Sequence, residues 1–236
     1  MPIDDSRVVV YVVTARHVVE NSRPHGALYI RAALKAGSAA DFKTNHDSWR
    51  SHPSSDVAAI LAGDPSELAL QPVPLHLVAT DDWVRSNEVG EGDDLFFVGL
   101  FAQHPGREQI QPVVRFGNIA LMPREPVLVT TATGSARMDA YLAEARSWGG
   151  QSGSPVFILD HPYRDPSLRI ALLGLVSGHF DIEERLAISG DLAELGSAKV
   201  PINAGMAIVM PGQKIHELLM DDELAERRKA MVRGPN

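Results

Sequence analysis

Residues 148–155 have the sequence Trp-Gly-Gly-Gln-Ser-Gly-Ser-Pro, in which the hydroxyl residue Ser152 lies among glycines and ahead of a proline. Glycine lets the backbone take positive φ and bring its N–H groups close to a ligand. A serine in such a loop is a candidate nucleophile, and the N–H groups of Gly150 and Ser152 would stabilise the oxyanion that its attack creates. The alternative is an ordinary tight turn before an apolar strand.

A serine hydroxyl is a weak nucleophile at neutral pH unless a base removes its proton, and two other segments offer suitable groups. His17 follows the β-branched run at residues 8–13, which predicts a buried strand that ends just before the imidazole. Asp56 opens the apolar run at residues 57–62. Each residue also has a simpler interpretation, as a half-buried structural histidine and as a turn aspartate.

The elements that must position these residues are short predicted strands separated by Gly and Pro turn signals. This spacing, with almost no 3.6-residue period, favours an all-β sandwich or a pair of barrels. Residues 35–52 are polar and predicted to be irregular, and a connecting segment begins at residue 81. One helix is predicted at the C-terminus, where Ile215, Leu218, Leu219 and Leu224 have helical spacing. The predicted strands are residues 8–13, 27–34, 57–62, 75–79, 95–101, 113–122, 127–131, 140–146, 156–160, 170–177 and 206–210.

The composition of the 236-residue chain narrows the class of protein. Apolar residues make up 44%, which is enough for a substantial core, and the net charge of −8 with no basic cluster argues against a nucleic-acid partner. No apolar run is long enough to span a membrane. The chain has no cysteine, which excludes disulfides and thiolate chemistry. No signal peptide is recognisable, so the localisation expected from the chain as written is cytoplasmic.

Two other hydrolase classes fit less well. The nine histidines are scattered without an H-E-x-x-H pattern, so we expect no metal site and no cofactor. An α/β-hydrolase esterase is disfavoured because residues 150–154 lack the last glycine of G-x-S-x-G and the chain lacks strand–helix alternation.

The three candidate residues occur in the order His17, Asp56, Ser152, separated by 39 and 96 positions. With residues 14–19 (Thr-Ala-Arg-His-Val-Val) and 55–58 (Ser-Asp-Val-Ala), the chain resembles the trypsin- and chymotrypsin-like serine peptidases, especially the bacterial branch that includes the high-temperature-requirement proteases. α/β-Hydrolases have the order Ser, acid, His instead. Residues 174–178 (Gly-Leu-Val-Ser-Gly) resemble the family's substrate-pairing strand, and residues 203–208 resemble its last barrel strand.

The resemblance implies two packed, six-stranded antiparallel β-barrels, an N-terminal one in residues 1–87 and a C-terminal one in residues 88–236 with the final helix. It implies a serine endopeptidase acting on polypeptides, with Ser152 as nucleophile and His17 as general base and then general acid. Asp56 would orient His17, and the N–H groups of Gly150 and Ser152 would form the oxyanion hole. The alternative is a peptidase fold retained as a binding or scaffold module. The oligomeric state stays open.

Two departures from the family pattern lead to further expectations. Gln151 replaces the aspartate that pairs with a newly cleaved N-terminus in vertebrate members, so that form of zymogen activation is not expected. The family has two strands before the one that leads into the histidine, whereas Val8 is only seven positions after Met1. We therefore expect either a reading frame that begins further upstream or an incomplete first barrel. An upstream signal segment would make the protein periplasmic or secreted.

The resemblance also points to residues that would contact substrate. It places Arg146 near the base of the pocket for the residue before the cleaved bond, and Ser177, Gly178 and His179 at its wall. Two cationic groups there would favour an acidic substrate residue. Alternatively, Arg146 points outward on a strand whose other face is buried. The acidic insertion at residues 180–199 would gate or shape this pocket.

Overall fold

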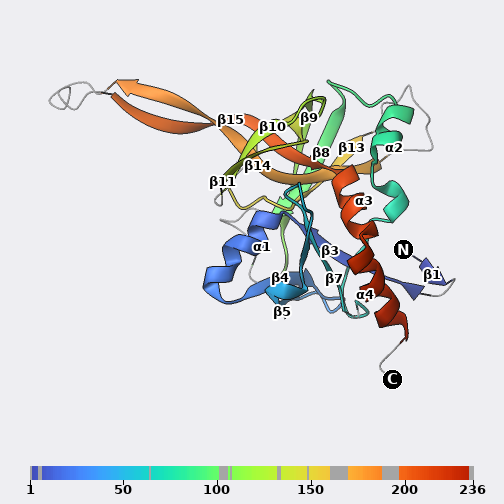
Figure 1. Cartoon of the computed structure of the whole chain (residues 1–236). Coiled ribbons are helices and arrows are strands. Elements are labelled where there is room, and N and C mark those ends of the chain that lie inside the picture. Colours follow the sequence, from blue (N-terminus) through green and yellow to red (C-terminus); the bar gives the residue numbers. More distant parts are fainter. Residues whose placement is uncertain are drawn as a thin grey trace.

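The computed structural model describes residues 2–4, 7–63, 65–100, 106, 108–131, 134–147, 149–159, 170–187 and 197–233. Strands are the commonest regular structure in the described chain, and helices pack beside them (Figure 1).

The C-terminal part contains the predicted closed barrel. Six strands are joined by antiparallel pairing in the order β12-β15-β14-β13-β8-β9, and β9 closes the ring on β12. Large apolar side chains such as Leu95, Phe97, Ile119 and Leu173 are buried together in its core. The strands are β8 (Asp94–Leu100), β9 (Pro112–Leu121), β12 (Tyr141–Glu144), β13 (Pro155–Leu159), β14 (Ile170–Ala187) and β15 (Ser197–Pro211).

A second closed barrel is not confirmed in the N-terminal part, whose described strands form three separate sheets, as the expected alternative of an incomplete first barrel allows. β3 (Tyr11–Thr14), β7 (Ala58–Leu61) and β6 (Arg50–Ser51) form one sheet, β4 (Leu28–Ala33) and β5 (Ala39–Thr44) a second, and β1 (Pro2–Asp4) and β2 (Arg7–Val8) a third. A barrel closes only when every strand pairs on both edges. β3 pairs with β7 alone, and an apolar cavity of about 360 Å³ lies along residues 9–13.

Helices are more numerous than predicted. α1 (Arg16–Ser22) begins two residues after β3 and carries His17. α2 (Asp81–Ser86) occupies the predicted connection, and the Thr80 hydroxyl caps it by accepting a hydrogen bond from the Trp83 N–H. Short 3-10 helices are η1 (Arg23–His25), η2 (His46–Ser48) and η3 (Leu75–Leu77).

The predicted C-terminal helix is two helices, α3 (Gly212–Met220) and α4 (Asp222–Arg233). The break lies at Asp221, whose carboxylate accepts a hydrogen bond from the Glu223 N–H in the first turn of α4. Both helices run from the barrel along the N-terminal sheets (Figure 1). The buried Arg228 of α4 donates a hydrogen bond to the Tyr11 hydroxyl of β3 (2.7 Å). The C-terminal helices therefore join the two parts of the chain.

Several strand predictions also need correction. The polar segment 35–52, predicted to be irregular, contains β5 and β6; the middle residues of β5 are exposed, so no apolar alternation marked it. Residues 75–79 form η3 and a single bridge between Val78 and Leu172 instead of a strand. β10 (Val127–Thr131) pairs antiparallel with β11 (Gly134–Met138), a strand that the prediction did not include.

β14 continues beyond the predicted strand end at residue 177, and β15 begins before the predicted start at residue 206. They pair from Asp181 with Asn203 to Ala187 with Ser197, and the hairpin projects from the barrel (Figure 1). Part of the predicted acidic insertion, residues 188–196, lies outside the described residues. No helix in the described chain is long and apolar enough to cross a bilayer.

Candidate active site

His17 and Asp56 are brought together by the first turn of α1. The Arg16 N–H donates to the Asp56 carbonyl oxygen (3.2 Å), and the His17 N–H donates to Asp56 Oδ1 (2.9 Å). The start of a helix has N–H groups without partners within the helix, so an acceptor there satisfies them. The segment before β7 is thereby fixed against the residue that carries the imidazole.

The side chains of His17, Asp56 and Ser152 form a continuous hydrogen-bonded chain. His17 Nδ1 lies 2.6 Å from Asp56 Oδ2, and His17 Nε2 lies 2.9 Å from Ser152 Oγ. These residues come from α1, from the loop before β7 and from the loop before β13. The structure thus joins three residues that lie far apart in the sequence.

Asp56 is only 1% exposed, and a buried carboxylate is tolerated only when donors surround it. Besides the two contacts with His17, Asp56 Oδ2 accepts a hydrogen bond from Ser177 Oγ (2.5 Å). Sequence reasoning assigned Ser177 to a substrate pocket and missed this contact. No local pattern signals it, because the two residues are 121 positions apart.

The loop that carries Ser152 depends on its glycines. Gly150 has φ +92° and Gly153 has φ +87°, a region that side chains rarely adopt. A Cβ on Gly153 would lie 2.3 Å from Thr14 Oγ1, so the loop is in direct contact with the end of β3. The Gly153 N–H donates to the Val176 carbonyl oxygen (2.7 Å), which fixes the loop to β14.

Ser152 borders a cavity of about 360 Å³ between the N-terminal strands and the barrel. Its walls include Leu28, Ile30, Trp49, Val98 and Gly150. A cavity of this size beside a hydroxyl and an imidazole has room for several atoms of a substrate.

The predicted substrate-contacting residues lie in two places. Ser177 is buried, and its carbonyl oxygen accepts a hydrogen bond from Ser152 Oγ (3.2 Å). His179 is half-buried, and its Nε2 lies 3.3 Å from Asp181 Oδ1. Gly178 lies between them in β14. Arg146 is exposed next to Ser147, whose buried Oγ has no hydrogen-bond partner among the described residues.

Gln151, which replaces the family's aspartate, is 2% exposed. Within the described part of the chain, no group of three or more His, Asp or Glu side chains is arranged to hold a metal ion.

A closed six-stranded antiparallel barrel, with a serine loop at its edge that meets a histidine, is the type of fold found in serine peptidases. The family model of the trypsin-like peptidase domain matches residues 3–161. The chain belongs to this family, whose members act on polypeptides. A comparison with curated proteins finds no match. The bacterial branch stays a prediction, since the family model does not distinguish branches.

Proposed function

We propose that the protein is a serine endopeptidase that hydrolyses peptide bonds through an acyl-enzyme intermediate on Ser152. The observation that carries this proposal is the hydrogen-bond chain from Asp56 through His17 to Ser152, with distances of 2.6 and 2.9 Å. Both fall in the range of direct hydrogen bonds, so the proton can move without rearrangement of the backbone.

In the first step, Ser152 Oγ attacks the carbonyl carbon of the substrate and its proton moves to His17 Nε2. The Nδ1–H of His17 stays bonded to Asp56, whose carboxylate stabilises the imidazolium that forms. His17 then gives the proton to the leaving amine, and an ester on Ser152 remains. Water attacks this ester with His17 again as base, which releases the acid and regenerates the hydroxyl.

The N–H groups of Gly150 and Ser152 are proposed to bind the oxyanion. The positive φ of Gly150 supports this assignment, because it lets consecutive N–H groups converge on one point. In comparable sites, loss of one such donor lowers the rate by about 10²- to 10³-fold.

Ser177, Gly178 and His179 are proposed to contact the substrate residue before the cleaved bond. The hydrogen bond between Ser152 and the Ser177 carbonyl supports the proximity of this segment to the reacting atoms. The exposure of Arg146 favours the alternative in which its side chain points outward. His179 has an acidic neighbour in Asp181, so we propose no preference for acidic substrates.

We also propose that residues 1–87 and 88–236 are the two structural units of one peptidase domain. All six strands of the closed barrel lie in the second range, and the three N-terminal sheets lie in the first. The first unit then corresponds to an open form of the family's N-terminal barrel, since among the described strands β3 pairs with β7 alone.

A fluorophosphonate probe, which reacts with activated serines, tests the proposed function. We expect labelling of the wild-type protein and its loss in both Ser152→Ala and His17→Ala. Ser86→Ala and His25→Ala are matched controls. They remove a hydroxyl and an imidazole from exposed positions outside the candidate site. A folded wild-type protein that resists labelling would support the scaffold alternative instead.

A further inference from the structure

The loop that carries Asp56 begins with another histidine, His52, which is buried. His52 is 5% exposed, and its backbone N–H donates to the Val57 carbonyl oxygen (2.8 Å), which closes the loop around Asp56. The two strands next to this loop, β6 and β7, are short and pair over only two positions. Backbone pairing with β6 therefore contributes little to the position of Asp56.

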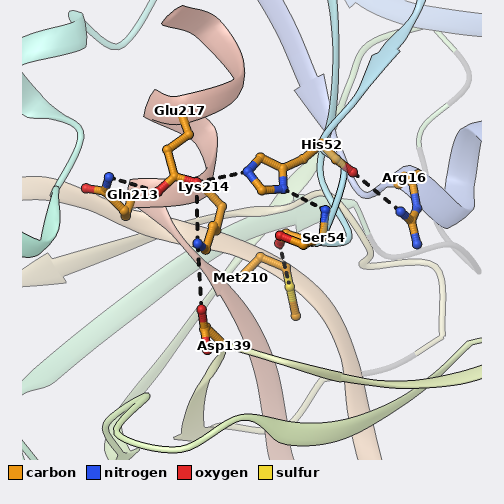
Figure 2. Close-up of polar contacts among 9 residues, drawn as sticks. Arg16, His52, Ser54, Asp139, Met210, Gln213, Lys214 and Glu217 are labelled. Atoms are coloured by element: carbon orange, nitrogen blue, oxygen red, sulfur yellow. Dashed lines mark hydrogen bonds and ion pairs between the residues drawn. The ribbon is translucent and has the colours of Figure 1, made fainter. Parts of the chain in front are cut away.

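Both ring nitrogens of His52 have partners. Nδ1 accepts a hydrogen bond from the Ser54 N–H (3.2 Å), and Nε2 lies 3.0 Å from Glu217 Oε2 on α3 (Figure 2). Because Nδ1 is an acceptor, the hydrogen of the neutral ring is on Nε2 and is donated to Glu217. The imidazole thus stabilises the turn at Ser54 and connects the loop to α3.

The Glu217 carboxylate is itself held in place. Gln213 Nε2 donates to Oε1 (3.0 Å), and Lys214 Nζ lies 3.3 Å from Oε2, while Lys214 also reaches Asp139 (Figure 2). Partial burial raises the pKa of Glu217, but the contacts with Gln213, His52 and Lys214 outweigh it, so the pKa lies below its usual value. At neutral pH His52 therefore faces a fixed carboxylate.

The same loop is held from two further sides. The His52 carbonyl oxygen accepts a hydrogen bond from Arg16 Nη1 (3.4 Å), and Arg16 is the residue before His17. The buried Ser55 contacts Met210 Sδ of β15 with its hydroxyl (3.3 Å). A displacement of His52 is therefore transmitted to both sides of the contact between His17 and Asp56.

We propose that His52 and Glu217 are positioning residues, which act together to hold the Asp56 carboxylate in register with His17. This inference deepens the proposed function and rests on it. Neither side chain touches the reacting atoms. Their effect passes through the loop at residues 52–57, so α3, which follows the barrel, controls the acid–base partners supplied by the N-terminal part.

The test compares variants on the two sides of this contact. Glu217→Ala removes the acceptor of His52 without altering the loop, and Glu217→Gln keeps an acceptor oxygen. His52→Asn keeps an acceptor for the Ser54 N–H, as in an Asx turn, but is too short to reach Glu217. Glu223→Ala is the matched control, because Glu223 joins α4 to Arg50 of β6 (3.1 Å) without contacting residues 52–57.

The second-order rate of fluorophosphonate labelling is measured against pH for each variant. We expect Glu217→Ala and His52→Asn to lower it by roughly 10- to 100-fold, as small misplacements of a catalytic group do. The midpoint of the pH profile should move to lower pH, because a displaced carboxylate stabilises the imidazolium of His17 less. Glu217→Gln should lose less than Glu217→Ala, and the double variant should lose no more than either single variant. A merely structural role would reduce the amount of reactive protein without moving the midpoint.

A second readout is independent of activity. We expect the short hydrogen bond between His17 Nδ1 and Asp56 (2.6 Å) to give a far-downfield proton resonance. This resonance should weaken or shift in Glu217→Ala and His52→Asn but not in Glu223→Ala. The inference is overturned if both the midpoint and the resonance of these two variants match those of Glu223→Ala. An unlabelled wild-type protein would refute the proposed function alone, and the resonance would still decide whether His52 positions Asp56.

Discussion

The two parts of the molecule hold their share of the candidate site in different ways. Ser152 lies in a loop of the closed barrel. The hydrogen bond from the Gly153 N–H to the Val176 carbonyl oxygen fixes this loop to β14. His17 lies on α1 and Asp56 in the loop before β7, next to an open three-stranded sheet. Backbone N–H groups of α1 and the Ser177 hydroxyl bind Asp56, and Glu217 of α3 binds His52 of the same loop. The nucleophile side is thus positioned by strand pairing, whereas the acid–base side depends on contacts supplied by the other part.

Because of this difference, we expect substitutions in the two parts of the molecule to affect stability and reactivity to different extents. Substitutions that disturb strand pairing should lower both, because the barrel is one cooperative unit. Substitutions of the polar contacts should lower reactivity while the strand pairing of the barrel stays intact.

Replacement of the nucleophile gives the largest expected effect and separates the two properties most completely. Ser152→Ala should lower peptidase activity by roughly 10⁴-fold or more, since the remaining groups cannot form the acyl-enzyme. The melting temperature should stay within a few degrees, because one partly exposed oxygen is removed. Activity on a generic protein substrate and thermal unfolding measure the two outcomes. Collapse of the fold would mean that the hydroxyl is structural.

Gly153→Ala should lower both stability and activity, because it disrupts the contact between the serine loop of the barrel and Thr14 of β3. The new Cβ would lie 2.3 Å from Thr14 Oγ1 at φ +87°, and positive φ alone costs a side chain about 1–2 kcal/mol. Relief of the clash must move the serine loop away from β3 and His17. Gly149→Ala is the control, since nothing lies within 4 Å of its added Cβ. Equal melting temperatures and labelling rates for the two variants would contradict the close contact.

Ser177→Ala should have a smaller effect on reactivity than Gly153→Ala, together with a loss of stability. It removes one donor from the buried Asp56 while the Ser177 carbonyl stays in place, so we expect roughly a tenfold loss of labelling rate. Loss of a hydrogen bond to a charged group costs about 1.5–3 kcal/mol of stability. Chemical denaturation measures this cost. A labelling rate equal to that of the wild type would show that Asp56 does not need this donor.

The smallest effect concerns the pH dependence of stability. Glu217 has a lowered pKa in the folded protein, so its contacts contribute stability that is fully present above the usual glutamate value and is lost as pH falls through the lowered value. Wild type should therefore melt slightly above Glu217→Gln near pH 7, and the difference should vanish once the pH has fallen through the lowered pKa of Glu217 and its carboxyl is protonated. If the difference in melting temperature persists in acid, it arises from packing and not from the charge of Glu217.

The sequence predicts the candidate site better than its surroundings. The glycine-rich segment at Ser152 and the order of His17, Asp56 and Ser152 are local or linear signals, and the folded chain brings these residues within hydrogen-bonding distance. The contacts of Asp56 with Ser177 and of His52 with Glu217 join residues 121 and 165 positions apart, and no pattern marks them. They exist only once the barrel and α3 are in place.

The fold prediction succeeds where apolar alternation is strong and fails where it is weak. The closed barrel is confirmed, and its buried strand residues carry a clear signal. β5 was not predicted because Asp41, Phe42 and Lys43 are exposed and show no apolar alternation. α2 was not predicted because six residues are too few to show a helical periodicity. The second closed barrel was expected from the resemblance, and the described N-terminal strands leave the sheet of β3 open.

The close approach of Gly153 to Thr14 also bears on how the protein matures. If Ser152 is the nucleophile, a nascent chain whose barrel has formed before its N-terminal sheets holds a hydroxyl with no base beside it, which is nearly inert at neutral pH. Hydrolytic activity then requires that both parts have folded and that the serine loop has docked beside His17.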